Sequence, residues 1–194
     1  MMALKKQGLR TPQIVPTLDG ADFFEGITMS ETIHGGRPTT TTHWRTISRY
    51  LGALHEVTRD WPQRPGFLAS SDLLSAERGG DVDLAGMPHD AKARCRAAWS
   101  RVKPQETCVV HGDPGASNIF VTQEDDVVLI DWDEARVDAP AFDLAALPED
   151  VSPPSGDDLW IARQAASAWE AAVSWRVEPE YARRRLAEVE SGSA

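Results

Sequence analysis

Three oxygen-bearing side chains stand near the ends of short apolar segments in the middle of the chain. An apolar run at 108–110 stops at His111-Gly112-Asp113, and Asn118 follows five positions after the aspartate. A second run, 127–130, ends in Asp131. Strands that end in Asp or Asn bring oxygen ligands to one end of a small sheet, as a hard divalent cation such as Mg²⁺ requires. Phosphoryl transfer needs such a site, so this is the chemistry that the pattern predicts.

The elements that must hold these residues are a strand, a turn and a β-hairpin. Residues 108–113 predict a buried strand that feeds a turn. Apolar positions 119–121 and 127–130 flank the polar residues 123–126, which is typical of two paired strands. A simpler interpretation also exists, because glycine, proline, aspartate and asparagine can serve only to shape and cap a turn.

Three stretches, in this order, carry a family resemblance: HGDPGASN at 111–118, LIDWDEA at 129–135 and DLA at 143–145. They resemble the aminoglycoside phosphotransferase family of kinase-like enzymes, whose catalytic loop is HGDxxxxN. A Ser117, His111, Asp131 triad is disfavoured, since no G-x-S-x-G elbow surrounds the serine. One departure is visible: Asp138-Ala139-Pro140 stands where the family usually has Gly-Asp-Pro before DLA.

The resemblance implies a role for each matching residue. Asp113 would be the catalytic base, with His111 and Gly112 supporting the catalytic loop. The metal ligands would be Asn118 and Asp131, and Asp143 would be a structural carboxylate.

The same resemblance implies an α+β, protein-kinase-like fold. It would consist of a mainly helical C-lobe with a catalytic β-hairpin and a two-strand remnant of the N-lobe. Residues 1–33 would form the partial N-lobe and hinge, and residues 34–194 the catalytic and acceptor-binding lobe. The backbone of Glu31, Thr32 and Ile33 would face the nucleotide ring, although a plain loop is the simpler interpretation of this stretch.

The upstream strands and the helices follow from apolar spacing and turn residues. Apolar segments 12–18 and 21–29 are separated by Asp19-Gly20, which predicts a hairpin. Trp44, Ile47, Leu51 and Leu54 recur at helical spacing, with N-cap candidates at 39–42. His43 and His55 on the flanks of this helix are expected to be surface or packing residues. Further helices are predicted at 71–78, from 89 or 90 to 102, at 159–176 after a cap at Asp157 or Asp158, and at 180–189.

Composition places the chain among ordinary soluble globular proteins, with 194 residues, of which 41% are hydrophobic and 26% charged. Its net charge of −10 is concentrated around the candidate site, because residues 113–158 contain 13 acidic and only 1 basic residue. Such a field attracts metal ions and cationic acceptors and disfavours nucleic acid. We expect a cytoplasmic protein with no membrane span, and the two cysteines, Cys95 and Cys108, to be reduced and structural.

The function implied by the resemblance is an O-phosphotransferase that uses Mg²⁺ and either ATP or GTP. Its acceptor would be a hydroxylated small molecule that can be cationic, such as an aminoglycoside, and a macrolide is also a candidate. The family's glycine-rich hairpin and lysine upstream of the hinge have no counterpart here, so an N-terminally truncated member is expected. The alternative is a catalytically inactive, truncated kinase-like protein that binds a metal, a cationic ligand or a partner.

Overall fold

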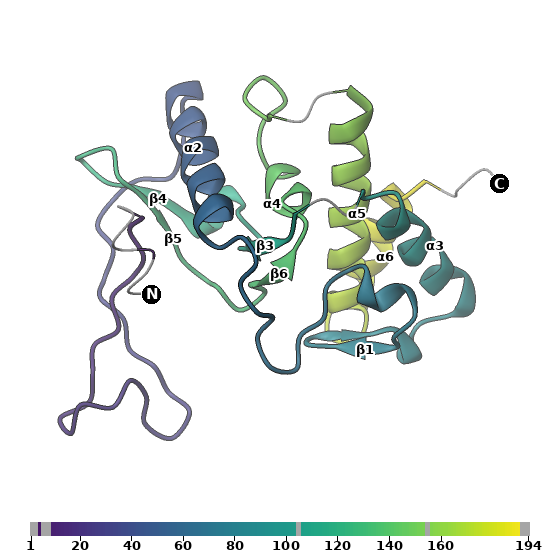
Figure 1. Ribbon diagram of the computed structural model, residues 1–194, viewed down its shortest axis with the longest axis horizontal. Helices are drawn as coiled ribbons and strands as arrows, with labels where there is room; N and C mark the ends of the chain where they lie inside the picture. Colours follow the sequence, from purple (N-terminus) through teal and green to yellow (C-terminus); the bar gives the residue numbers. More distant parts are fainter. Residues whose placement is uncertain (1–3, 5–8, 104–105, 154–155, 191–194) are drawn as a thin grey trace.

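The computed structural model describes residues 4, 9–103, 106–153 and 156–190 (Figure 1). Helix α2 and the hairpin β4–β5 lie on one side of the molecule, and helices α3, α5 and α6 lie on the other. Strands β3 and β6 and the short helix α4 stand between these two groups. The segment that carries the candidate site therefore runs through the middle of the fold.

Three antiparallel strand pairs make up the described sheets. Strand β3 (Cys108–Val110) pairs with β6 (Arg136–Asp138), and Cys108 stands opposite Asp138. Strand β4 (Ile119–Val121) pairs with β5 (Val127–Leu129) across the predicted polar turn. The third pair, β1 (Arg78–Gly79) with β2 (Val82–Asp83), is a short hairpin. The predicted strand and hairpin around the site are thus confirmed.

Helix α2 (Thr41–Val57) begins at the predicted N-cap region. The side chain of Thr40 accepts a hydrogen bond from the backbone N–H of His43, which satisfies one of the free donors of the first turn. Ile47, Leu51 and Leu54 are fully buried and pack in one hydrophobic cluster with Ile119 and Leu129 of the hairpin β4–β5. This contact fixes α2 against the site.

The remaining helices enclose a second, larger core. They are α3 (His89–Ser100), α4 (Ala141–Leu144), α5 (Gly156–Ser174) and α6 (Pro179–Glu188). In this core Trp99 of α3 and Trp169 of α5 pack with ring centroids 5.9 Å apart. Single 3₁₀ turns occur at Asp72–Leu74, Leu84–Gly86 and Ala116–Asn118.

Two helix predictions need correction. The helix predicted at 71–78 is only the 3₁₀ turn at 72–74, because the chain then enters the hairpin β1–β2, with Gly80 at a φ of +58°. Helix α5 starts at Gly156, so Asp157 and Asp158 lie in its first turn instead of capping it. Carboxylates in a first turn still favour the helix through its dipole.

The upstream hairpin is much weaker than predicted. Only isolated bridges form, between Ile14 and Ser30 and between Phe24 and Ile27, and no continuous strand covers 12–29. The two segments do run antiparallel, since the Val15 N–H donates to the Met29 carbonyl at 2.9 Å. Their apolar side chains remain exposed, Phe24 and Ile27 by 65% and 67%. A two-stranded hairpin is marginal without a packed layer, which explains the missing ladder.

Cys95 and Cys108 are free and buried, and burial raises the pKa of each thiol to about 12. Both therefore stay protonated near neutral pH, as structural cysteines do.

None of the helices in the described ranges has the length and apolar character needed to cross a membrane.

Candidate active site

The loop that follows β3 is fastened to Asp143 of α4. The backbone N–H groups of His111 and Gly112 donate to the two carboxylate oxygens of Asp143 at 2.9 and 3.0 Å. His55 Nε2 of α2 lies 2.9 Å from the same carboxylate. Burial alone would raise the pKa of Asp143, but the bond and charge of His55 and the two N–H donors outweigh it, so the pKa is lowered. The carboxylate therefore stays charged and holds the loop.

The contact between His55 and Asp143 could not be predicted from the sequence. It is buried, so the expectation of a packing residue was right and that of a surface position was wrong. Its partner lies 88 positions away. Helical spacing could show that residue 55 flanks the buried stripe of α2, but not what it faces.

Gly112 permits the sharp exit from β3. Its φ is +95°, in the left-handed region that favours glycine. A Cβ at this position would lie 2.8 Å from the Glu134 carbonyl oxygen and 3.1 Å from Arg136 Nη1. The loop and the segment before β6 can approach this closely only because residue 112 has no side chain.

His111 is a buried residue that holds the loop from inside. Its Nδ1 accepts from the Asp113 N–H at 3.3 Å, and its Nε2 lies 2.9 Å from the Ile130 carbonyl oxygen. The pair of contacts requires the tautomer with the proton on Nε2. The ring also packs on Trp132, with centroids 4.7 Å apart. With both nitrogens engaged by the backbone, His111 acts as a support and not as a nucleophile.

Asn118 fixes the carboxylate of Asp113. Its Nδ2 donates to Asp113 Oδ2 at 2.8 Å and to the Asp113 carbonyl oxygen at 3.0 Å. Both amide hydrogens are used, so the amide oxygen is directed away from Asp113, and no described residue donates to it. Asp113 itself is exposed. The arrangement presents one oriented carboxylate and one available amide oxygen.

Asp131 lies at the end of β5 with an exposed carboxylate and a φ of +62°. It lines a cleft of about 780 Å³ together with the predicted hinge residues Glu31, Thr32 and Ile33. Phe120 and Ile130 supply apolar surface in the same cleft. Two of the predicted groups, the hinge and Asp131, are therefore brought together; Asn118 does not line this cleft. We call it the nucleotide cleft below, after the ligand that the resemblance implies for the hinge residues.

Asp113 faces a second, smaller cleft of about 250 Å³, which it lines with Gly112 and Phe142. Helices α5 and α6 supply the opposite wall, including Glu170, Arg185 and Glu188. Arg185 joins Glu170 through Nη2 at 3.0 Å and also pairs with Glu188. We call this the acceptor cleft, after the substrate that the resemblance implies for the Asp113 side of the loop. The residues of this wall were not predicted from the sequence. They are polar residues on two helices far from the loop in the chain, and such residues are usually interpreted as solvent-exposed.

Glu134 is a further titratable group close to Asp113. Burial raises its pKa to about 7; the charge of Arg136 lowers it, whereas Asp113 and Glu170 raise it further. One carboxylate oxygen is buried and has no hydrogen-bond partner among the described residues. In the sequence, only the position of Glu134 within the LIDWDEA stretch indicated that it lies near the site.

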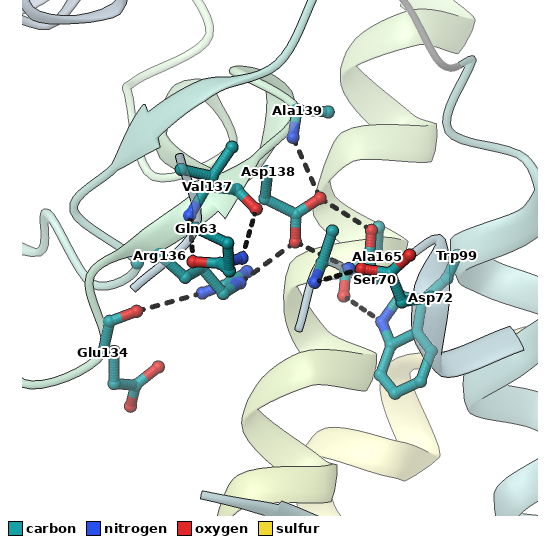
Figure 2. Close-up of polar contacts among 12 residues, drawn as sticks. Gln63, Ser70, Asp72, Trp99, Glu134, Arg136, Val137, Asp138, Ala139 and Ala165 are labelled. Atoms are coloured by element: carbon teal, nitrogen blue, oxygen red, sulfur yellow. Dashed lines mark hydrogen bonds and ion pairs between the residues drawn. The ribbon is translucent and has the colours of Figure 1, made fainter. Parts of the chain in front are cut away.

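Asp138, the residue that departs from the family pattern, has a structural role (Figure 2). Its carboxylate accepts from the backbone N–H and hydroxyl of Ser70 at 3.0 and 2.8 Å. It also accepts from Arg136 Nε at 3.0 Å, in an ion pair that is almost completely buried. The Arg136 guanidinium in turn lies 3.3 Å from the Trp169 ring centroid. This network fastens the loop at residues 60–75 and helix α5 to β6.

The donors present suit Mg²⁺. Asn118 and Asp131 offer an amide and a carboxylate oxygen, the ligand type that this cation prefers. No cluster of three or more His, Cys, Asp or Glu side chains within the described ranges could hold a metal by itself. Mg²⁺ is commonly held by one or two carboxylates together with substrate phosphates, so a two-residue site is adequate.

Solved structures share this fold. Choline kinase LicA from Streptococcus pneumoniae superposes with a TM-score of 0.66 at 15% identity, covering 97% of this chain and 75% of LicA. Spectinomycin phosphotransferase APH(9)-Ia in complex with AMP has a TM-score of 0.57 at 13% identity, covering 98% and 78%. The predicted kinase-like α+β fold is confirmed.

Curated relatives are also found by sequence. A homoserine kinase from Methylobacterium nodulans is 30% identical over 166 residues, which is 75% of this chain and 49% of the relative. Another, from Methylobacterium sp. strain 4-46, is 35% identical over 111 residues, which is 53% of this chain and 34% of the relative. The chain thus spans no more than about half the length of either. Residues 1–186 match the model of the phosphotransferase enzyme family, and the chain belongs to that family, as the loop and its fold indicated.

Proposed function

We propose that this chain takes part in transferring a phosphoryl group from ATP or GTP to the hydroxyl group of a small molecule. The observation that carries the proposal is the position of one loop with respect to two clefts. Asp113 lines the acceptor cleft, while Asp131 and residues 31–33 line the nucleotide cleft. Asn118 lines neither cleft but lies between these residues: its side chain donates to Asp113, and its carbonyl oxygen accepts from the Ile130 N–H, next to Asp131, at 2.9 Å.

In this proposal Asp113 orients the acceptor hydroxyl and takes up its proton as the oxygen attacks the terminal phosphorus, and the bond from that phosphorus to the bridging oxygen breaks to release ADP or GDP. Phosphoryl transfer depends mainly on positioning and charge stabilisation, so a rigidly held base suits it. The rigidity comes from Asn118 and from Asp143 through the loop backbone. Mg²⁺, held by Asn118 and Asp131, would neutralise charge on the nucleotide phosphates.

The nucleotide ring would lie on the backbone of Glu31, Thr32 and Ile33, over Phe120 and Ile130. These apolar side chains offer a flat surface beside main-chain polar groups, which is what recognition of a base requires. The boundary between lobes at residues 33 and 34 stays a prediction.

The acceptor would be smaller than an aminoglycoside or a macrolide. A cleft of about 250 Å³ lies below the usual range for drug-sized ligands, roughly 300–1,000 Å³. Its wall carries Glu170 and Glu188 beside Arg185 and Arg163, so both an ammonium and a carboxylate could find a partner. The names of the relatives found by sequence, both homoserine kinases, point the same way. We propose a small hydroxylated amine as the acceptor.

The second candidate is a kinase-like protein that binds ligands without catalysis. It is favoured by the nucleotide cleft, whose described lining contains no lysine. A loss of charge stabilisation on the phosphates would remove much of the rate.

The test is ADP or GDP formation by the folded protein with Mg²⁺ and a panel of acceptors. The panel contains homoserine, choline, ethanolamine, a macrolide and several aminoglycosides. We expect turnover with one of the small amino alcohols and none with the large antibiotics. No turnover with any acceptor would overturn the proposal for this chain and favour the inactive alternative, and turnover only with an antibiotic would overturn the assignment of the acceptor.

A further inference from the structure

The nucleotide cleft has an unusual charge balance for a site that would hold a polyphosphate. Its described lining includes three carboxylates, Glu31, Asp131 and Asp133, and a single basic side chain, Arg64. The phosphates of a nucleotide are strongly anionic and need cations close by. The described lysines do not supply them, because Lys92 pairs with Glu77 and Lys103 lines a different cleft.

Arg64 is oriented by contacts on its face and on its edge. The guanidinium carbon lies over the Phe67 ring, 3.3 Å from the centroid. Its Nη2 donates to the carbonyl oxygen of Asp133, two residues beyond Asp131. The guanidinium is therefore close to the candidate metal ligand, where phosphates would lie. Its Nε is buried and has no hydrogen-bond partner among the described residues.

The segment that carries Arg64 is fastened at both ends. On one side Gln63 makes two hydrogen bonds of 2.9 Å with the backbone of Val137 in β6 (Figure 2). On the other side the ring of Phe67 lies against Gly80, where an added Cβ would come within 2.5 Å of it. The cation is thus preorganised on a rigid support, as binding sites require.

Burial lowers the pKa of Arg64, and the neighbouring charges of Asp81 and Asp133 oppose this effect. An arginine remains protonated in either case. A partly desolvated guanidinium would gain from an anionic partner.

We propose that Arg64 binds the terminal phosphates of the nucleotide. The inference rests on the proposed function, because it requires the nucleotide to lie in this cleft. It gives the site a cation within the described part of the chain. Arg64 would contact the phosphates and leave the base and ribose untouched.

The experiment is calorimetric titration of adenosine and of Mg·ADP into wild type, Arg64→Gln and Arg64→Ala. Arg64→Gln removes the charge but can keep the hydrogen bond to the Asp133 carbonyl oxygen. It is included in case Arg64→Ala fails to fold. The matched control is Arg59→Gln, which removes the same charge from an exposed side chain paired with Glu56 and Glu106 outside the cleft. We expect both Arg64 variants to bind Mg·ADP roughly 10- to 100-fold more weakly, adenosine affinity to stay the same, and the control to match wild type.

Two results would overturn the inference alone. One is unchanged affinity for Mg·ADP in the Arg64 variants. The other is an equal loss for adenosine and Mg·ADP, which would mean that Arg64 only shapes the cleft. If wild type bound neither ligand, the proposed nucleotide site would itself be wrong, and the inference would fall with it.

Discussion

At the scale of single residues, Asp131 combines a left-handed backbone with an exposed carboxylate. Asparagine tolerates this conformation about as well as aspartate, so Asp131→Asn removes the charge without adding strain. We expect Mg·ADP to raise the melting temperature of wild type and to raise that of the variant much less, because a ligand stabilises only the state that it binds. Scanning fluorimetry with and without the ligand measures both shifts.

Asp125→Asn is the matched control for this prediction, since Asp125 is also exposed and has a φ of +63° in the turn between β4 and β5. It should show the wild-type shift. Equal shifts in wild type and Asp131→Asn, or no shift in either, would remove Asp131 from the metal site.

Glu134 predicts a pH dependence of stability. Its pKa is raised from 4.5 to about 7 in the folded protein, so the folded state binds more protons than the unfolded state between these values. The free energy of unfolding therefore falls as pH rises through this window, by roughly 1–3 kcal/mol from this group. Glu134→Gln should remove that part of the fall.

Urea unfolding at pH 5 and at pH 7.5 measures the effect, with the exposed Glu124→Gln as control. The Glu134 variant should gain stability relative to wild type at the higher pH, and the control should not. Identical pH dependence in all three proteins would mean that Glu134 is not buried as described.

The sequence could identify the motif residues but not their partners. Asp113, Asn118 and Asp131 follow from a local pattern of strand ends and spacing, and Asp143 from the family resemblance of the DLA stretch alone. The contact of Glu170 with Arg185 could not be predicted in this way. It joins two helices, and no local sequence pattern indicates which polar residues of two helices will meet. Contacts over long separations depend on the packed fold, which periodicity does not encode.

At the scale of elements, the exit from β3 depends on Gly112. Gly112→Ala would place a Cβ 2.8 Å from the Glu134 carbonyl oxygen in a backbone conformation that alanine rarely adopts. We expect a loss of about 1–3 kcal/mol in the free energy of unfolding. Denaturant titration measures it.

Gly52→Ala provides the contrast, because Gly52 lies inside α2 with no atom within 4 Å of an added Cβ. It should gain about 0.5–1 kcal/mol. If Gly112→Ala were as stable as wild type, the close approach of the loop to residue 134 would be wrong.

Helices were predicted better than the upstream strands for a physical reason. In α2 the cap, the apolar stripe and the tertiary contacts agree, so local and global preferences coincide. In 12–29 the turn signal is correct, but its apolar residues find no packed layer within the described part of the chain. A turn can bring two segments together; it cannot supply the burial that makes a sheet.

At the scale of the whole molecule, the loop at 111–118 lines the acceptor cleft through Asp113 and is fixed from three directions. Asp143 holds its backbone, His111 holds it to β5, and Asn118 holds its carboxylate. In the proposed reaction, Asp113 would hold the acceptor, while Asp131 and residues 31–33 would hold the nucleotide. We propose that this chain joins the two clefts in a single reaction.

The most direct measurement of this claim is ³¹P NMR of ATP with Mg²⁺, a small amino alcohol and the folded protein. We predict the appearance of a phosphomonoester with a matching amount of ADP. Asp113→Asn should reduce the rate by about 10²- to 10⁴-fold while keeping nucleotide affinity, since it removes only the base. A spectrum in which ATP stays intact, or in which the variant forms the phosphomonoester as fast as wild type, would contradict the account.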